Sequence, residues 1–166
     1  MSPGSFINAD VYENDIRGYG VGIAITSGSP YTLMTEGNRI YSITFMDSGT
    51  TSSGTTVSSG MLLANSQNNQ IFENIIQNYR VGIHLIGNDD HTFSTLRNSI
   101  TDNDISNNNR GMWIVNYAGV LQDNTILRNN VHNNADYGIY IQEPSENTIQ
   151  DNDVCYNGHT CEDGDF

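Results

Sequence analysis

One phrase recurs along this chain and limits how it can fold. The pattern N-x-[IV]-x-x-N-x-[IV] occurs in full at 69–76, 98–105, 124–131 and 147–154, with degenerate copies around Asn14 and Asn38. Aligning the second Asn of each copy gives positions 14, 38, 74, 103, 129 and 152, with steps of 24, 36, 29, 26 and 23 residues. Periods of this length are typical of solenoids, in which each repeat forms one coil.

A second phrase follows the Asn pair and identifies the secondary structure of the repeat. It is a Gly followed by apolar residues, as in "GIAI" (22–25), "GMLL" (60–63), "GIHL" (82–85), "GMWI" (111–114) and "GIYI" (138–141). Alternating apolar runs this short predict strands rather than helices. Helical repeats also need roughly 33 residues or more. The sequence therefore predicts an all-β parallel β-helix that forms a single domain over residues 1–166.

The physics of stacked coils explains the composition, of which only 36% is hydrophobic. We expect inward Ile, Val and Leu side chains of successive coils to stack about 4.8 Å apart and fill a narrow core. Turn Asn side chains can stack in hydrogen-bonded ladders. The Gly before each apolar run is expected to allow a sharp turn into the strand.

These Asn-rich coils resemble those of right-handed β-helix proteins of the pectate-lyase-like group, in the broad parallel β-helix repeat or NosD-like style. The resemblance covers roughly residues 8 to 157 and implies a right-handed solenoid of about six coils. It also implies an extracellular or periplasmic location, although the N-terminus has neither the basic nor the apolar region of a signal peptide. The resemblance is specific for fold and names no reaction.

Two segments stand outside the repeats. The Ser/Thr/Gly-rich stretch 46–60 is predicted to be a loop inserted between strands. Residues 155–166 are predicted to form a C-terminal cap over the last coil, closed by a disulfide between Cys155 and Cys161. Two unpaired thiols are the alternative, because two cysteines alone do not decide the redox state.

Strand alternation predicts an outward face that is unusually apolar. One outward column holds Ala24, Leu62, His84, Trp113 and Tyr140, and a parallel column holds Thr26, Ala64, Ile86, Val115 and Gln142. Such a face either binds sugar rings or is covered by the inserted loop or by a second subunit. Pectate-lyase-like proteins bind polysaccharide on such a face, so the resemblance implies substrate contacts at His84, Trp113 and Tyr140.

The candidates for catalysis are His84 in this column and four residues next to it. Arg80 and Arg110 precede the glycines that open the strands and are suited to gripping an anionic sugar. Asp89 and Asp90 follow the strand that holds His84, and glycoside hydrolysis needs two carboxylates. The alternatives are ion pairs for the arginines and an ordinary acidic corner for the aspartates.

A further column holds the residue before each aligned Asn: Glu13, Gly37, Glu73, Asp102, Arg128 and Asp151. Like charges at Glu73 and Asp102 would be stabilised by Ca²⁺. The alternative is a solvated acidic edge, with Arg128 neutralising its neighbours.

The charge restricts the choice of partner. The chain has no Lys, and its formal net charge is −13, which argues against nucleic acid. No apolar stretch has membrane-spanning length. Three functions remain: a polysaccharide-binding module, a polysaccharide lyase, hydrolase or epimerase, and a structural module that forms homo-oligomers through the apolar face or the open coil ends.

Overall fold

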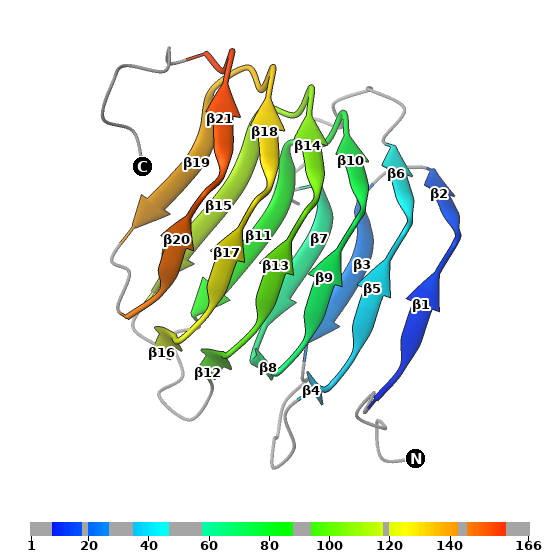
Figure 1. Cartoon of the computed structure of the whole chain (residues 1–166), viewed down its shortest axis with the longest axis vertical. Coiled ribbons are helices and arrows are strands. Elements are labelled where there is room, and N and C mark those ends of the chain that lie inside the picture. Colours follow the sequence, from blue (N-terminus) through cyan, green and yellow to red (C-terminus); the bar gives the residue numbers. More distant parts are fainter. Residues whose placement is uncertain are drawn as a thin grey trace.

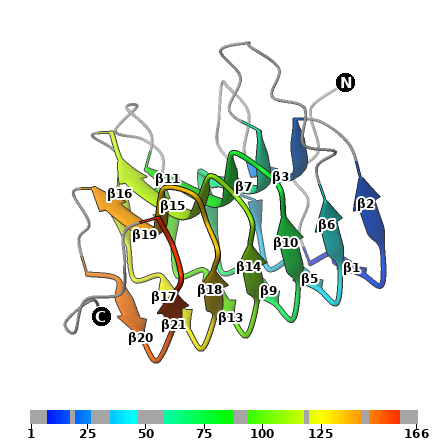
Figure 2. The same ribbon diagram turned by 90° about the horizontal axis from the view of Figure 1, so that it is seen from above.

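The structure is a parallel β-solenoid. This computed structural model describes residues 8–17, 20–26, 35–46, 58–87, 94–117, 120–142 and 146–158. The strands of successive coils lie side by side in rows, from the blue end of the chain to the red end (Figure 1). Every strand pairing is parallel, and the view from above shows the rows wrapping around a common interior (Figure 2).

Four sheets make up the wall. The first contains β1 (Asp10–Tyr12), β5 (Arg39–Tyr41), β9 (Gln70–Phe72), β13 (Ser99–Thr101), β17 (Thr125–Leu127) and β20 (Thr148–Gln150). The second contains β2 (Asp15–Arg17), β6 (Thr44–Met46), β10 (Ile75–Gln77), β14 (Asp104–Ser106), β18 (Asn130–His132) and β21 (Asp153–Cys155). The third contains β3 (Val21–Thr26), β7 (Ser59–Ala64), β11 (Val81–Gly87), β15 (Arg110–Asn116) and β19 (Tyr137–Gln142). The fourth contains β4 (Thr35–Glu36), β8 (Ser66–Gln67), β12 (Ser94–Leu96) and β16 (Val120–Gln122).

The predicted parallel β-helix is confirmed, but the predicted count of six coils is wrong. Within the described residues, β4–β7, β8–β11, β12–β15 and β16–β19 each place one strand in every sheet, which makes about four complete coils. The first repeat contributes only β1–β3 and the last only β20–β21. Of the loop predicted at 46–60, residue 46 ends β6 and residues 59–60 begin β7, and residues 47–57 lie outside the described part of the chain.

The core is a set of inward columns, one side chain per coil. Ile40, Ile71, Ile100 and Ile126 stack in the first sheet, and each is at most 2% exposed. Phe45, Ile76, Ile105 and Val131 stack in the second sheet and are fully buried. Because each coil adds the same few apolar side chains, a chain of modest hydrophobic content still closes a continuous core.

Asn side chains at the corners form three hydrogen-bonded ladders. The first joins Asn38, Asn69, Asn98, Asn124 and Asn147, and the second joins Asn74, Asn103, Asn129 and Asn152. In each rung, Oδ1 of the later coil accepts bonds from both the backbone N–H and the side-chain amide of the earlier coil. The Oδ1 of Asn103, for example, accepts from Asn74 N at 3.1 Å and from Asn74 Nδ2 at 2.9 Å.

The alignment at Asn38 was wrong by one column. Asn38 bonds to Asn69, the first Asn of the next phrase, and the second column of that coil is occupied by the buried Ile43. The residue before this column in the second coil is therefore Ser42 rather than Gly37. Ile43 keeps only the backbone half of the rung, because its N–H donates to Asn74 Oδ1 at 3.2 Å.

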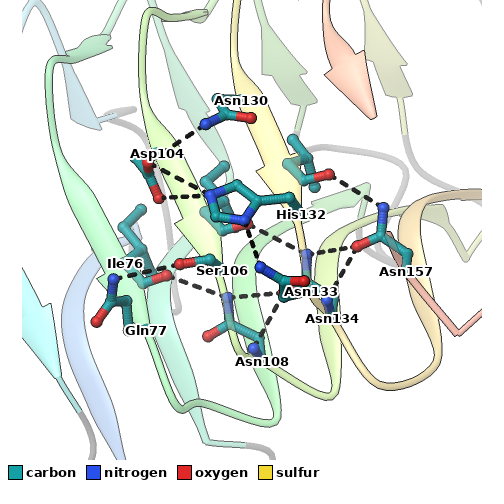
Figure 3. A network of polar contacts seen from close by, with 12 residues as sticks. Ile76, Gln77, Asp104, Ser106, Asn108, Asn130, His132, Asn133, Asn134 and Asn157 are labelled. Carbon is teal, nitrogen blue, oxygen red and sulfur yellow. Dashed lines mark hydrogen bonds and ion pairs between the residues drawn. The ribbon is translucent and has the colours of Figure 1, made fainter. Parts of the chain in front are cut away.

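The third ladder was not predicted. It joins Asn108, Asn134 and Asn157, and the N–H of Tyr79 donates to Asn108 Oδ1 at its first rung (Figure 3). From residue 69 onward the three corners keep a constant spacing of five residues, at 69, 74 and 79, then 98, 103 and 108, then 124, 129 and 134, then 147, 152 and 157. The unequal repeat lengths therefore arise on the side of the coil between the third corner and the next first corner.

Each of these corners begins with a left-handed residue directly before the ladder position. The positive φ angles include 56° at Asp102, 52° at Arg128 and 56° at Asn107, which precede Asn103, Asn129 and Asn108. The left-handed residue turns the chain, and the following side chain occupies the rung. Asn and Asp are the side chains that tolerate this conformation best, so their abundance follows from the number of corners.

Gly has a different role from the one predicted. Gly22, Gly60, Gly82, Gly111 and Gly138 are absent from the positive-φ residues and face the interior. A Cβ on Gly111 would lie 2.5 Å from both the Gly138 carbonyl oxygen and Val131 Cγ1. The residue is Gly because the neighbouring coil leaves no space for a side chain, and not because the turn needs a special backbone angle.

Removal of one rung should be costly. Asn103→Ala leaves the Ile71 carbonyl and the Asn129 Oδ1 without the donor that now reaches them at 3.0 and 2.9 Å. We expect the free energy of unfolding to fall by about 3 kcal/mol, measured by chemical denaturation. The exposed Asn109→Ala is the matched control, with an expected change within about 0.5 kcal/mol. Equal losses in the two variants would contradict the ladder as a source of stability.

Adding a side chain at Gly111 in β15 provides a second test of the packing. Gly111→Ala should lower the free energy of unfolding by about 1–3 kcal/mol, because the new methyl group meets backbone and a buried side chain on the next coil. The measurement is the thermal or chemical unfolding midpoint. An unchanged midpoint would contradict the close packing of Gly111 against the next coil.

Candidate functional site

The outer face of the third sheet carries three columns of side chains. The strand register places Ala24, Leu62, His84, Trp113 and Tyr140 in one column and Thr26, Ala64, Ile86, Val115 and Gln142 in a second. A third column, Val21, Ser59, Val81, Arg110 and Tyr137, lies beside the first. We call His84, Trp113, Tyr140, Arg110, Tyr137 and Asp136 the outer aromatic cluster.

Trp113 is the centre of this cluster. The imidazole of His84 stacks on it with ring centroids 4.7 Å apart and planes 6° from parallel. The Arg110 guanidinium carbon lies 4.5 Å from the Trp113 centroid and 5.7 Å from the Tyr140 centroid. Arg110 lies on β15 with Trp113, whereas His84 lies on β11 of the preceding coil. The indole is therefore contacted from its own strand and from the preceding coil, and the Arg contact is a cation–π interaction.

Asp136 fixes the position of Arg110. The Arg110 Nε–H donates to Asp136 Oδ2 at 3.1 Å, and the two side chains are 28% and 32% exposed. The Asp136 backbone N–H in turn donates to the Asn109 carbonyl at 2.7 Å, beside the third Asn ladder. Arg110 is therefore oriented by an ion pair on one side and by aromatic rings on the other.

Tyr137 and Tyr140 lie at the edge of the sheet. Their ring centroids are 5.1 Å apart and the planes are tilted by 52°. β19 is the last strand of the third sheet, so within the described residues no further strand pairs with its outer edge. Within the described residues, Tyr137 and Tyr140 therefore lie on a strand with one unpaired edge.

The middle of the outer face is buried although it points away from the core. His84 is 5% exposed and Val115 is fully buried, yet neither belongs to the interior apolar cluster. Burial lowers the pKa of His84 to about 4, and the Arg110 charge adds to the effect. His84 is therefore neutral at pH 7, and its ring packs against one face of Trp113.

Two ring nitrogens in this region lack a partner. In the part of the chain that the structure describes, neither His84 Nε2 nor Trp113 Nε1 makes a hydrogen bond, and both atoms are buried. Buried polar atoms of this kind cost free energy unless a partner is supplied. The aromatic column is therefore a place where packing has been favoured over hydrogen bonding.

The other predicted site residues do not join the cluster. Arg80 is exposed and precedes Val81, and because Val81 is the residue in register with Arg110, the two arginines do not share a column. Asp89 and Asp90 lie outside the described residues. Cys155 is half-buried in β21, and Cys161 lies outside the described residues, so the disulfide stays a prediction.

One member of the predicted Ca²⁺ pair, Asp102, forms an ion pair with Arg128 on the next coil. Asp102 accepts two bonds from Arg128, one from Nε and one from Nη2, each at 2.8 Å. The Arg128 hydrogen bond and charge lower the pKa of Asp102. Glu73 lies one coil earlier at the same corner. The described residues contain no group of three His, Cys, Asp or Glu side chains that could hold a metal ion.

Sequence reasoning missed Tyr137 and Asp136 and a second aromatic stack. Tyr137 directly precedes Gly138, and strict alternation along the strand would point its side chain into the interior. The sequence pattern therefore did not assign it to the outer face. On the first sheet, Tyr12, Tyr41 and Phe72 stack with centroids 5.2 and 4.8 Å apart, and Arg39 lies 5.0 Å from the Tyr41 ring. In the sequence, this stack is marked by an aromatic residue at the end of β1, β5 and β9.

His84 should make stability depend on pH. Its pKa is about 4 in the folded state, against an ordinary value of 6.5 for histidine, so between these pH values the unfolded chain binds more protons. The free energy of unfolding should therefore fall by up to about 3 kcal/mol as the pH drops from 6.5 to 4. His84→Gln removes this contribution, and the difference between the two pH profiles of denaturation isolates it. Parallel profiles would contradict the buried, neutral His84.

Comparison with protein families gives a match over nearly the whole chain. Residues 5–165 match the family model described as "Periplasmic copper-binding protein (NosD)". A search of curated proteins gives no match.

The described residues do not fit the copper ion that this description mentions. Both nitrogens of His132 are engaged, because Nε2 lies 3.3 Å from Asp104 Oδ1 and Nδ1 lies 2.8 Å from the Asn133 amide (Figure 3). His84 is buried behind Trp113. Met61 and Met112 are fully buried core residues. Within the described ranges, no three His, Cys, Asp or Glu side chains are grouped so that they could hold a metal ion.

The family match and the structure agree on the architecture. The family match covers residues 5–165, and the described part of that range is a parallel β-helix with Asn ladders at its corners. On this basis, the chain belongs to the NosD family.

Proposed function

We propose that this chain is a β-helix module that binds polysaccharide against the outer aromatic cluster, at Trp113, Tyr140 and Arg110. The observation that carries the proposal is the fixed position of Arg110 between Asp136 and the two aromatic rings. Outward aromatic rings with an oriented donor beside them suit a sugar, which has an apolar ring face and hydroxyl groups at its edge.

The terminal nitrogens of Arg110 supply the donors. Asp136 takes only the Nε–H, and in the described residues the Nη1 and Nη2 groups make no hydrogen bond. A hydroxyl or carboxylate oxygen of a sugar at Tyr140 could accept from them, since the guanidinium presents its N–H groups as a planar fork. His84 is too deeply buried for direct contact and would act by supporting Trp113.

The charge of the chain suggests which glycans bind. A net charge of −13 repels a long polyanion, although Arg110 could hold one isolated carboxylate. We therefore expect neutral or sparsely charged polysaccharides. The family description supports a periplasmic location for this binding, and the described residues include no helix able to cross a membrane.

Glycan binding can be followed through Trp113, because it is the only Trp in the chain. Neutral and acidic oligosaccharides, screened on an array and then titrated, should change its fluorescence. Tyr140→Ala should weaken binding at least tenfold, since it removes the ring at the open edge. Tyr156→Ala is the matched control, because Tyr156 is 83% exposed and lies outside the cluster.

Two outcomes would remove the proposal. One is the absence of any fluorescence change and any array signal with the folded protein. The other is an equal loss of affinity in Tyr140→Ala and Tyr156→Ala, which would place the glycan elsewhere.

A further inference from the structure

The first coil has an open edge. Within the described residues, no strand pairs with the outer edges of β1, β2 and β3. The inward side chains Val11, Ile16 and Ile23 are only partly buried, whereas their partners in the second coil, such as Phe45 and Met61, are fully buried. Tyr12 is 48% exposed and ends the aromatic stack of the first sheet, with one ring face against Tyr41.

Asn14 on this edge already has the ladder conformation. Its Nδ2 donates to the carbonyl of Tyr12, two residues earlier, at 2.7 Å. The ladder residues Asn103, Asn129 and Asn152 make the same bond to Thr101, Leu127 and Gln150. In the interior of the ladder, Oδ1 accepts from the coil before it. The Oδ1 of Asn14 is thus an acceptor set for a coil that the described chain does not contain.

The last coil has the complementary group. Asn152 closes the second ladder, and its Nδ2 donates to the Ile126 and Gln150 carbonyls. Its backbone N–H has no acceptor among the described residues, although the corresponding N–H groups of Asn103 and Asn129 donate to the next rung. Ile149, Val154 and Ile141 form a partly buried apolar layer beside it, like the layer on the first coil.

We propose that copies of this chain stack head to tail, with the last coil of one copy docked on the first coil of the next. Asn152 N–H of one copy then donates to Asn14 Oδ1 of the other, and Ile149 and Val154 cover Val11 and Ile16. Such a contact is heterologous and can continue into short filaments. This proposal does not rest on glycan binding, but the docked copy would bring its β3 beside β19, the edge that carries Tyr137 and Tyr140.

Like charges limit the contact. Asp151 of one copy would meet Glu13 of the next at the second corner, since both precede the ladder position and both have positive φ. The same corner inside the chain shows the favourable alternative, in which Arg128 lies over Asp102 with two bonds of 2.8 Å. Salt shortens the range of the repulsion, so association should strengthen as ionic strength rises.

Two charge reversals at this corner test the proposal. Glu13→Arg converts the repulsion across the contact into the Arg-over-Asp pair. Glu73→Arg makes the same change of charge at the same corner inside the solenoid, where it can pair only within one chain. Arg fits both positions, because Arg97 and Arg128 already hold φ angles of 50° and 52°. Sedimentation velocity at low and high salt measures the association, and circular dichroism confirms the fold of each variant.

We expect Glu13→Arg to lower the dissociation constant at least tenfold relative to Glu73→Arg. Adding Asn14→Ala to Glu13→Arg should reverse part of that gain, whereas Asn109→Ala should not. Equal sedimentation of the two charge variants would overturn the proposal. A monomeric Glu13→Arg at every concentration and salt would overturn it as well.

Discussion

The rungs of Asn side chains are the interaction on which the rest of this structure depends. A parallel solenoid must turn its chain several times per coil, and every turn leaves backbone groups that the strands cannot pair. Here the side-chain oxygen of one coil accepts both the backbone N–H and the amide of its neighbour, as at Asn103 and Asn74. The amide then donates to a carbonyl of the preceding coil, as from Asn103 to Ile71. The polar groups of each corner therefore form their hydrogen bonds mainly with the coils on either side.

This arrangement also fixes the lateral position of everything between the corners. Once Asn98 and Asn103 are aligned with the next Asn pair, the strand between them can only stack Ile100 on Ile126. The apolar core, the aromatic stack of the first sheet and the outer aromatic cluster are all consequences of this alignment. A composition that resembles a disordered segment therefore produces an ordered fold, because its polar residues bond to one another rather than to water.

Much of the fold could be predicted from the sequence, because each Asn and each Ile or Val of the repeated phrase occupies the same position in every coil. The third and later copies of the Asn pair are complete, and their partners are the predicted ones. The errors lie where a copy is incomplete. Ile43 replaces Asn in the second coil, so the only Asn of that copy was assigned to the wrong column. The coil count was too high because the terminal repeats supply corners but not all four strands.

The candidate site was less predictable than the fold. Strict alternation gave the column of His84, Trp113 and Tyr140 correctly, since these residues follow the inward Ile83, Met112 and Ile139. It could not assign Arg110 and Tyr137 to the same face, because Gly111 and Met112 both point inward and break the alternation. Burial of His84 also depends on what lies over the sheet, which a column pattern does not contain.

The constant five-residue spacing of the three corners has an evolutionary consequence. From the third coil onward, that half of each turn cannot gain or lose a residue without breaking a rung. Length can change only on the opposite side, where the segments after β11, β15 and β19 differ in size. Those segments follow the three strands that carry His84, Trp113 and Tyr140. New specificities can therefore be gained by lengthening or exchanging them, while the half of the coil with the constant spacing remains unchanged.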